Sequence, residues 1–210
     1  MKKVFAFVAV AAALLVAGKA SAQLSVNGGF LTNSISNSYK IGDKTVDTVM
    51  NGGAGAYLGL SYNIAFTEHW GVEPGVYVNY VGNNEKKGIA TITTDMIDLN
   101  VPVLFNYRVD FTDYFGIIGF VGPNFRYGLS ANSTTKYSDS TPQVKYDLYT
   151  KSAGASQLNR FDIGLMFGVG VHFNQFQIRA GYNLGLVDRN PEKDITAHYH
   201  NIFAGIGYAF

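Results

Sequence analysis

The chain has 210 residues, about the size of one domain, and is 47% hydrophobic and 15% charged. Its 24 Gly, 14 Tyr and 15 Phe favour pleated sheets over helices, because aromatic residues suit a strand surface and Gly allows backbones to approach closely. The sequence contains no cysteine, which excludes a disulfide scaffold and a thiolate metal site. The composition therefore predicts an all-β protein held together by its sheet.

The first 22 residues have the pattern of a secretory signal peptide. Two lysines precede an apolar run over residues 4–18, and the small residues 20–22 form a cleavage site. The run is shorter than the roughly 20 residues that a membrane-spanning helix needs. We expect residues 23–210 to form the mature domain. Cleavage would remove three lysines and no acid, leaving 13 basic and 15 acidic residues and a net charge of −2, which argues against nucleic-acid binding.

Eight segments of the mature part alternate between large apolar residues on one face and Gly, Asn or charged residues on the other. The last segment shows the pattern clearly, with Ile202 and Ile206 on one face and Asn201 and Gly205 on the other. In chain order the predicted strands cover residues 24–32, 55–66, 70–80, 97–108, 115–129, 161–173, 176–186 and 198–210. Pro74, Pro102 and Pro123 fall inside strands with a neighbour on each side, where we expect bulges or local bends.

Charge placement distinguishes a membrane barrel from a soluble β-sandwich. Within the predicted strands the charged residues all fall on the face without large apolar groups: Glu73, Asp98, Arg108, Arg126, Asp162 and Arg179. A charge on a lipid-facing position costs roughly 2–4 kcal/mol at the midplane, whereas the solvated face of a sandwich would carry more charge than these Gly-rich faces do. We therefore predict an all-β, eight-stranded antiparallel up-and-down transmembrane β-barrel, whose interior is just wide enough for side chains.

Buried charges need partners, so we expect the inward charges to form a network. The strand order places Arg126 between Asp98 and Asp162 toward one end of the barrel. Toward the other end, Glu73 and Arg179 face each other across the lumen, with Arg108 as a nearer alternative partner for Glu73. Such a network would plug the barrel as well as hold it.

The connections between the predicted strands alternate in length. Residues 67–69, 110–113 and 174–175 are short turns, and the long polar connections cover residues 33–51, 82–96, 130–160 and 188–197. Bacterial barrels have short periplasmic turns and long extracellular loops, so we expect both chain ends in the periplasm. The tyrosines of the longest connection, Tyr137, Tyr146 and Tyr149, either contact a surface ligand or extend the neighbouring strands beyond the membrane.

Aromatic residues gather at the short-turn rim, as an interfacial girdle would. The girdle that we predict consists of Phe66, Trp70, Phe105, Tyr107, Phe115, Phe173, Phe176 and Phe210.

The runs DMIDLNVPVLFNYRVDFTDYFGIIGFVGPNF and FDIGLMFGVGVHFNQFQIRAGYNLGL resemble the outer-membrane β-barrel domain of small "porin family" proteins of Gram-negative bacteria. The resemblance covers essentially the whole mature chain and implies the fold much more strongly than an activity. It also implies that Ile206, Tyr208 and Phe210 form the terminal signal that the barrel-assembly machinery reads during insertion. We expect a monomer surrounded by outer-membrane lipid.

Histidine is the first place to look for chemistry. His198 and His200 lie on one face of the last predicted strand, and small barrels that deacylate lipid A use a lipid-facing His, Ser and Glu. Here no His-x-Ser pair occurs and no carboxylate shares the apolar face, so we expect no catalytic residue, and no cofactor or metal either. The sequence favours a structural barrel that meets a surface ligand through its loops, with a lipid A-modifying enzyme and a narrow pore as alternatives.

Overall fold

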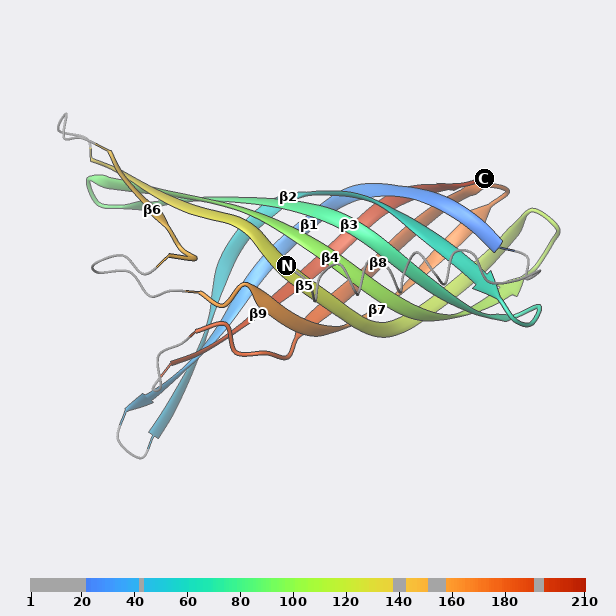
Figure 1. The fold of residues 1–210 in the computed structure, drawn as a ribbon, viewed down its shortest axis with the longest axis horizontal. Helices are drawn as coiled ribbons and strands as arrows, with labels where there is room; N and C mark the ends of the chain where they lie inside the picture. The colour runs from blue at the N-terminus through green and yellow to red at the C-terminus, as the bar shows by residue number, and fades with distance from the viewer. Residues whose placement is uncertain (1–21, 42–43, 138–142, 151–157, 191–194) are drawn as a thin grey trace.

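The computed structural model describes residues 22–41, 44–137, 143–150, 158–190 and 195–210 (Figure 1). The predicted signal peptide lies outside these residues, apart from Ala22 at its end. In the described part of the chain, no helix is long and apolar enough to cross a membrane.

Nine antiparallel strands make up the described structure. They are β1 (Ala22–Ile41), β2 (Lys44–Ala65), β3 (Trp70–Lys87), β4 (Ala90–Asp110), β5 (Phe115–Tyr137), β6 (Val144–Asp147), β7 (Phe161–Phe173), β8 (Phe176–Gly185) and β9 (Ile195–Ala209). Each strand pairs with the next around the sheet, and the pairing of β4 with β5 closes a ring of eight. The short β6 pairs only with the far end of β5, outside the ring. The predicted eight-stranded barrel is confirmed.

The strands alternate between an inward and an outward face, as the sequence pattern predicts. On β1, Ser25 and Asn27 are buried while Phe30 is 79% exposed. The same contrast runs around the ring, where Leu58 and Ile206 are also largely exposed. A closed sheet that turns its large apolar residues outward and its polar residues inward is suited to lipid and not to water.

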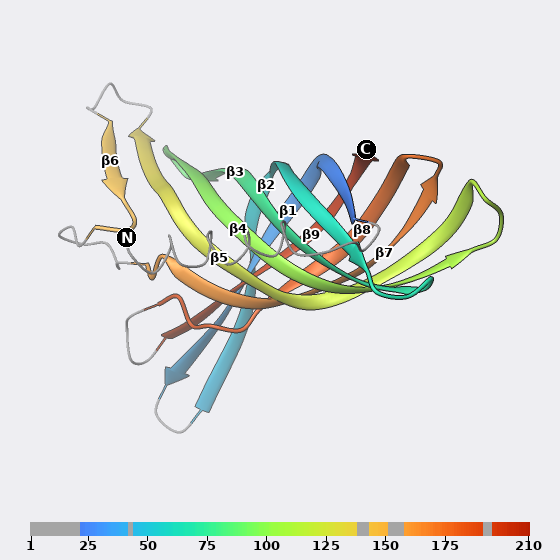
Figure 2. The ribbon, with the colours of Figure 1, turned by 45° about the vertical axis from the view of Figure 1, so that its right-hand side comes forward.

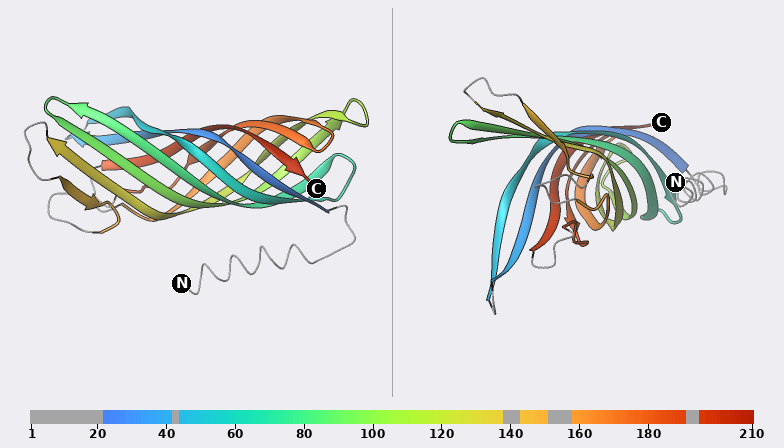
Figure 3. Two further views of the ribbon diagram at one scale, coloured as in Figure 1. Left: turned by 90° about the horizontal axis from the view of Figure 1, so that it is seen from above. Right: turned by 60° about the vertical axis from the view of Figure 1, so that its left-hand side comes forward.

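The two ends of the barrel differ. Three short hairpins join strands at one end, which also holds the C-terminus and which we call the short-turn end (Figure 1). At the opposite, long-loop end the wall splits into two protruding sheets, which point apart in Figure 3 (right panel). The first wing contains residues 33–41, 44–53 and 195–199, and the second wing contains residues 83–87, 90–97, 130–137 and 144–147.

The predicted loops 33–51 and 82–96 were therefore wrong, because these residues form paired strands for most of their length (Figure 2). They are rich in Ser, Asn and Thr, and among their apolar side chains Met96 is part of a buried apolar cluster and Ile35 packs against it. Backbone pairing and polar cross-strand contacts hold them, such as Ser38 with Asp47 at 2.6 Å and Thr93 with Asn84 at 2.7 Å. Of the two interpretations of residues 130–160, the strand extension is realised by β5, which continues to Tyr137.

Each wing bends away from the barrel at a β-bulge. In the first wing Asn33 pairs with Gly53 and Ser34 with Asn51, which leaves Gly52 as the extra residue. In the second, Ile97 pairs with Ser130 and Asp98 with Gly128. An extra residue in one strand kinks it and increases its twist.

The bulges that we predicted at the prolines do not occur. The strand register is the same on both sides of Pro74, Pro102 and Pro123. The ladder instead has short gaps directly beyond Pro74 and Pro102, where the pairing resumes in unchanged register. A gap accommodates the missing N–H without shifting the strand.

Candidate functional site: a lumen closed at several levels

The lower lumen, toward the short-turn end, is crossed by a buried ion pair. Glu73 on β3 and Arg179 on β8 meet across the ring, and both guanidinium Nη atoms donate to the carboxylate oxygens at 2.7 Å. Arg179 Nε donates to Gln177 Oε1 at 2.9 Å, and its guanidinium lies 5.6 Å from the centre of the Phe120 ring. Two parallel charge-assisted hydrogen bonds in a buried site form a rigid bridge across the barrel.

Above this pair lies a cavity of about 60 Å³. Its polar lining consists mainly of amide side chains, from Asn27, Asn79, Asn100, Asn124, Asn183 and Asn201. These amides bond to one another, for example Asn124 Nδ2 to Asn100 Oδ1 at 3.1 Å. The rings of Phe120 and Phe203 stack at 6.3 Å and fill the neighbouring space. The remaining volume is that of a few water molecules, far below the roughly 300 Å³ of a small-molecule site.

The upper lumen holds a second charged cluster. Arg126 lies opposite Asp162 in the β5–β7 ladder, with Nη1 3.7 Å from Oδ2, and Nη2 donates to Asn201. Asp98 on β4 pairs with Gly128, two residues along β5 from Arg126, so Asp98 is a diagonal neighbour of Arg126. Among the ion pairs of the described residues, Arg126 contacts Asp162 and not Asp98. Asp162 is therefore the ion-pair partner of Arg126, and Asp98 lies diagonal to Arg126 without an ion pair to it among the described residues.

Asp98 interacts electrostatically with a cation that the sequence analysis did not single out, Arg189. Arg189, in the connection between β8 and β9, is 0% exposed. Its Nη2 donates to the Tyr149 hydroxyl at 2.9 Å, its Nε donates to the Asn159 carbonyl at 3.0 Å, and its guanidinium lies 4.6 Å from the centre of the Tyr199 ring. Burial alone would lower the Arg189 pKa, but electrostatic interactions with Tyr149 and Asp98 raise it above its ordinary value.

Arg189 and Tyr149 form the centre of a cap on the long-loop end. Tyr149 and Tyr199 pack against Leu31, Val81, Met96, Ala131 and Ala197 in the largest buried apolar cluster of the described residues. Arg160 lies 4.4 Å from the centre of the Tyr149 ring and donates to the Gly128 and Leu129 carbonyls at 3.1 Å. The cap is thus built from side chains of two connections that are distant in sequence.

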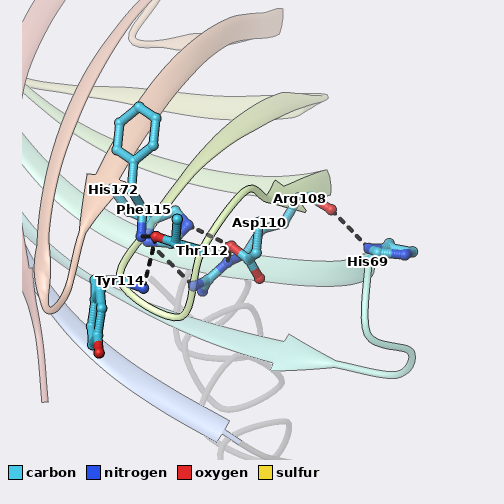
Figure 4. Close-up of polar contacts among 7 residues, drawn as sticks. All are labelled: His69, Arg108, Asp110, Thr112, Tyr114, Phe115 and His172. Atoms are coloured by element: carbon cyan, nitrogen blue, oxygen red, sulfur yellow. Dashed lines mark hydrogen bonds and ion pairs between the residues drawn. The ribbon is translucent and has the colours of Figure 1, made fainter.

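The short-turn end carries a third charged group, shown in Figure 4. Arg108 Nε donates to Asp110 Oδ1 at 2.7 Å, and His172 Nε2 lies 2.6 Å from the same oxygen. Arg108 Nη2 is 3.3 Å from His172 Nδ1, and His69 Nδ1 is 3.1 Å from the Arg108 carbonyl. Arg108 therefore pairs at the rim and is not the partner of Glu73. A polar opening of about 280 Å³ beside it is lined by Trp70, Glu68 and Asn106, among others.

The residues of the predicted aromatic girdle are all strongly exposed at or near the short-turn end. These are Phe66, Trp70, Phe105, Tyr107, Phe115, Phe173, Phe176 and Phe210. Trp70 packs on Tyr107 with ring centres 4.7 Å apart, and Tyr208 contacts both Phe176 and Phe210. Ile206, of the predicted insertion signal, faces outward on β9.

His198 and His200 lie toward the long-loop end of β9. Their Nδ1 atoms are buried without a hydrogen-bond partner, and the His200 ring stacks on Tyr182 with centres 6.0 Å apart. The described residues contain no group of three His, Cys, Asp or Glu side chains that fits a metal ion.

Several solved structures of outer-membrane barrels align with most of this chain at low sequence identity. Ail, the attachment invasion locus protein of Yersinia pestis, is 18% identical with a TM-score of 0.45, and the alignment covers 90% of this chain and 98% of Ail. Neisserial surface protein A is 11% identical with a TM-score of 0.43, covering 90% and 99%. The outer membrane protease OmpT of Escherichia coli is 9% identical with a TM-score of 0.35, covering 93% and 99%. At these values the likenesses say nothing about the activity of this chain.

No match was found among curated proteins. A comparison of the sequence with protein families does identify one. Residues 17–189 match the family described as "Outer membrane protein beta-barrel domain". That match spans most of the chain and agrees with a closed barrel whose apolar side chains face outward. The chain therefore belongs to the outer membrane protein β-barrel domain family.

Proposed function

We propose that this outer-membrane barrel is a non-conducting scaffold that holds its two wings at the cell surface, where they contact a surface ligand. The observation that carries the proposal is the series of closures along the lumen. These are the Arg108–Asp110–His172 group, the Glu73–Arg179 pair, the amide-lined centre, the Arg126–Asp162 pair and the Arg189–Tyr149 cap. An ion would have to break several buried hydrogen bonds to pass.

The proposal includes an orientation. The signal peptide exports the chain, the assembly machinery reads the terminal Ile206, Tyr208 and Phe210, and the short-turn end with its aromatic girdle remains on the periplasmic side. The wings then extend into the medium. What supports this orientation is the difference in size between the two ends, because bacterial barrels have short periplasmic turns and long extracellular segments.

Conductance in planar lipid bilayers tests the closed lumen. We expect no stable openings from the purified full-length protein, and large, reproducible openings would contradict the proposal in favour of a pore. A parallel test compares lipid A by mass spectrometry from cells with and without the gene. We expect identical spectra, and a difference that returns only with the intact gene would favour the enzyme.

A further inference from the structure

The first wing has two long edges, of which the edge on β9 is covered by another segment and the edge on β2 is open in the described structure. On the β9 edge, Arg189 N donates to the Ala197 carbonyl at 3.0 Å and Ala197 N donates to Asp188 Oδ1 at 2.9 Å. That edge is covered by the connection that carries the cap. The opposite edge, on β2, has no such cover among the residues that the structure describes.

The β2 edge is open from Lys44 to Met50. The last pair between β2 and β3 is Ala54 with Gly82, after which β3 follows β4 into the second wing. At the base of the split, Asn83 Nδ2 donates to the Asn51 carbonyl at 3.1 Å. Within the described residues, the backbone of Lys44–Met50 pairs only with β1. Alternate residues of an antiparallel strand direct N–H and C=O away from their partner, so this segment presents an unpaired row of donors and acceptors.

The split between β2 and β3 is built into the backbone. Gly53 has a φ of 109°, which is the left-handed region that favours glycine, and a Cβ there would collide with the Gly82 carbonyl. Together with the bulge at Gly52, this turn takes β2 out of the barrel wall just where β3 leaves it. The space that β3 occupies beside β2 lower in the wall therefore continues upward without a strand in it, as the views in Figures 1 and 3 show.

We propose that the β2 edge from Lys44 to Met50 binds an extended segment of another protein, which adds to the first wing as a strand. A row of backbone groups at strand spacing is satisfied by another strand and by few other ligands. The segment would run in the direction of β3, antiparallel to β2, because that direction continues the ladder already present below Ala54. Val46, Val49 and Met50 are exposed on this edge, with Val49 at 74%, so the segment gains affinity by placing apolar side chains against them. The inference rests on the proposed function, since the edge must face the medium.

The test begins with the full-length protein in phospholipid nanodiscs. Amide hydrogen exchange should show alternating fast and slow sites from Lys44 to Met50, the fast ones facing the open edge. Proline is then placed at whichever of Asp47 and Thr48 has the fast amide, which removes a donor from the open edge and leaves the β1 pairing intact. The matched control carries alanine at the same position.

A phage library of linear peptides is selected against the protein in nanodiscs. We expect enriched peptides that protect the fast amides of Lys44–Met50, bind the alanine control unchanged and bind the proline variant about tenfold more weakly or worse, the factor that corresponds to about 1.4 kcal/mol. Peptides that bind the proline variant equally well, or no enrichment over it, would overturn the inference. A dimer of the protein alone that the proline variant abolishes would assign the edge to a second copy instead. The conductance of the barrel does not depend on this edge, so failure here leaves the proposed scaffold standing.

Discussion

Six buried charged side chains in the described barrel balance one another. The acids are Glu73, Asp98 and Asp162, and the bases are Arg126, Arg179 and Arg189. Five of the six follow from strand alternation, which places them on the inner face. The sixth was hidden because Arg189 comes from a connection that has no period to follow. A signal was present, since two carboxylates beside a single Arg126 leave one negative charge unmatched and call for another cation nearby.

At the residue scale, breaking the lower ion pair should be costly. Glu73→Ala leaves the Arg179 guanidinium buried without its carboxylate, and we expect a loss of about 3–5 kcal/mol of unfolding free energy. Urea unfolding of the protein in phospholipid vesicles measures it. The double variant Glu73→Met with Arg179→Met removes both charges and should lose less than the single change. A double variant that loses as much as the single changes Glu73→Met and Arg179→Met together would show that the pair is not coupled.

Asp147 gives a dependence on pH outside the membrane. The Tyr149 backbone N–H donates to the Asp147 carboxylate at 2.9 Å, and the Thr150 hydroxyl donates to it at 3.1 Å. The hydrogen bond from the Tyr149 N–H is the main reason that the Asp147 pKa is lowered. A lowered pKa means that the carboxylate stabilises this turn above the ordinary aspartate pKa, and that the contribution disappears as pH falls through the folded value. We therefore expect Tyr149 amide exchange, corrected for its intrinsic pH dependence, to lose protection below about pH 4. Asp147→Asn should remove this transition, and an unchanged transition in that variant would assign it to another group.

At the element scale, the sequence predicts strands well where a bilayer adjoins them and poorly beyond it. Inside the membrane each strand needs one apolar face, so the alternation is strong and the eight ring strands are found. In residues 33–51 and 82–96 only a few apolar side chains, such as Ile35 and Met96, pack in or against a core, so a periodic pattern of apolar residues is not required along these segments. These residues pair because they continue the β1–β2 and β3–β4 hairpins of the barrel wall. The residue pattern of one strand carries no information about such pairing. The prediction of bulges at the prolines was wrong because a short gap in the ladder accommodates the missing N–H as well as a bulge would.

The contact between β5 and the cap can be tested with glycine. A Cβ added at Gly128 would fall on the Tyr149 hydroxyl, which also accepts from Arg189. Gly128→Ala should therefore displace Tyr149 and loosen the cap, with a loss of about 1–3 kcal/mol in local opening free energy, measured by amide exchange at Tyr149 and Arg189. Gly119→Ala on the same strand is the matched control, because nothing lies within 4 Å of its Cβ position. Equal exchange in the two variants would show that Tyr149 is not seated on β5.

At the scale of the whole molecule, the barrel differs from the parts that it carries. The apolar outer wall and the filled lumen of the barrel both follow from the alternation of residues along each strand. The cap and the wings depend on how connections that are distant in sequence meet, as Tyr149 and Arg189 do. For that reason the fold and most of the inner charges were predictable, while the cap and the open edge of β2 were not.

Labelling of intact cells tests the orientation and the surface exposure of the wings most directly. The chain has no cysteine, so Thr48→Cys in the first wing and Asp113→Cys in a short turn each introduce a single thiol at an exposed position. A polyethylene glycol maleimide too large to cross the outer membrane should modify Thr48→Cys on intact cells and Asp113→Cys only after lysis. Modification of Asp113→Cys on intact cells, or of Thr48→Cys only after lysis, would contradict a barrel that holds its wings outside the cell.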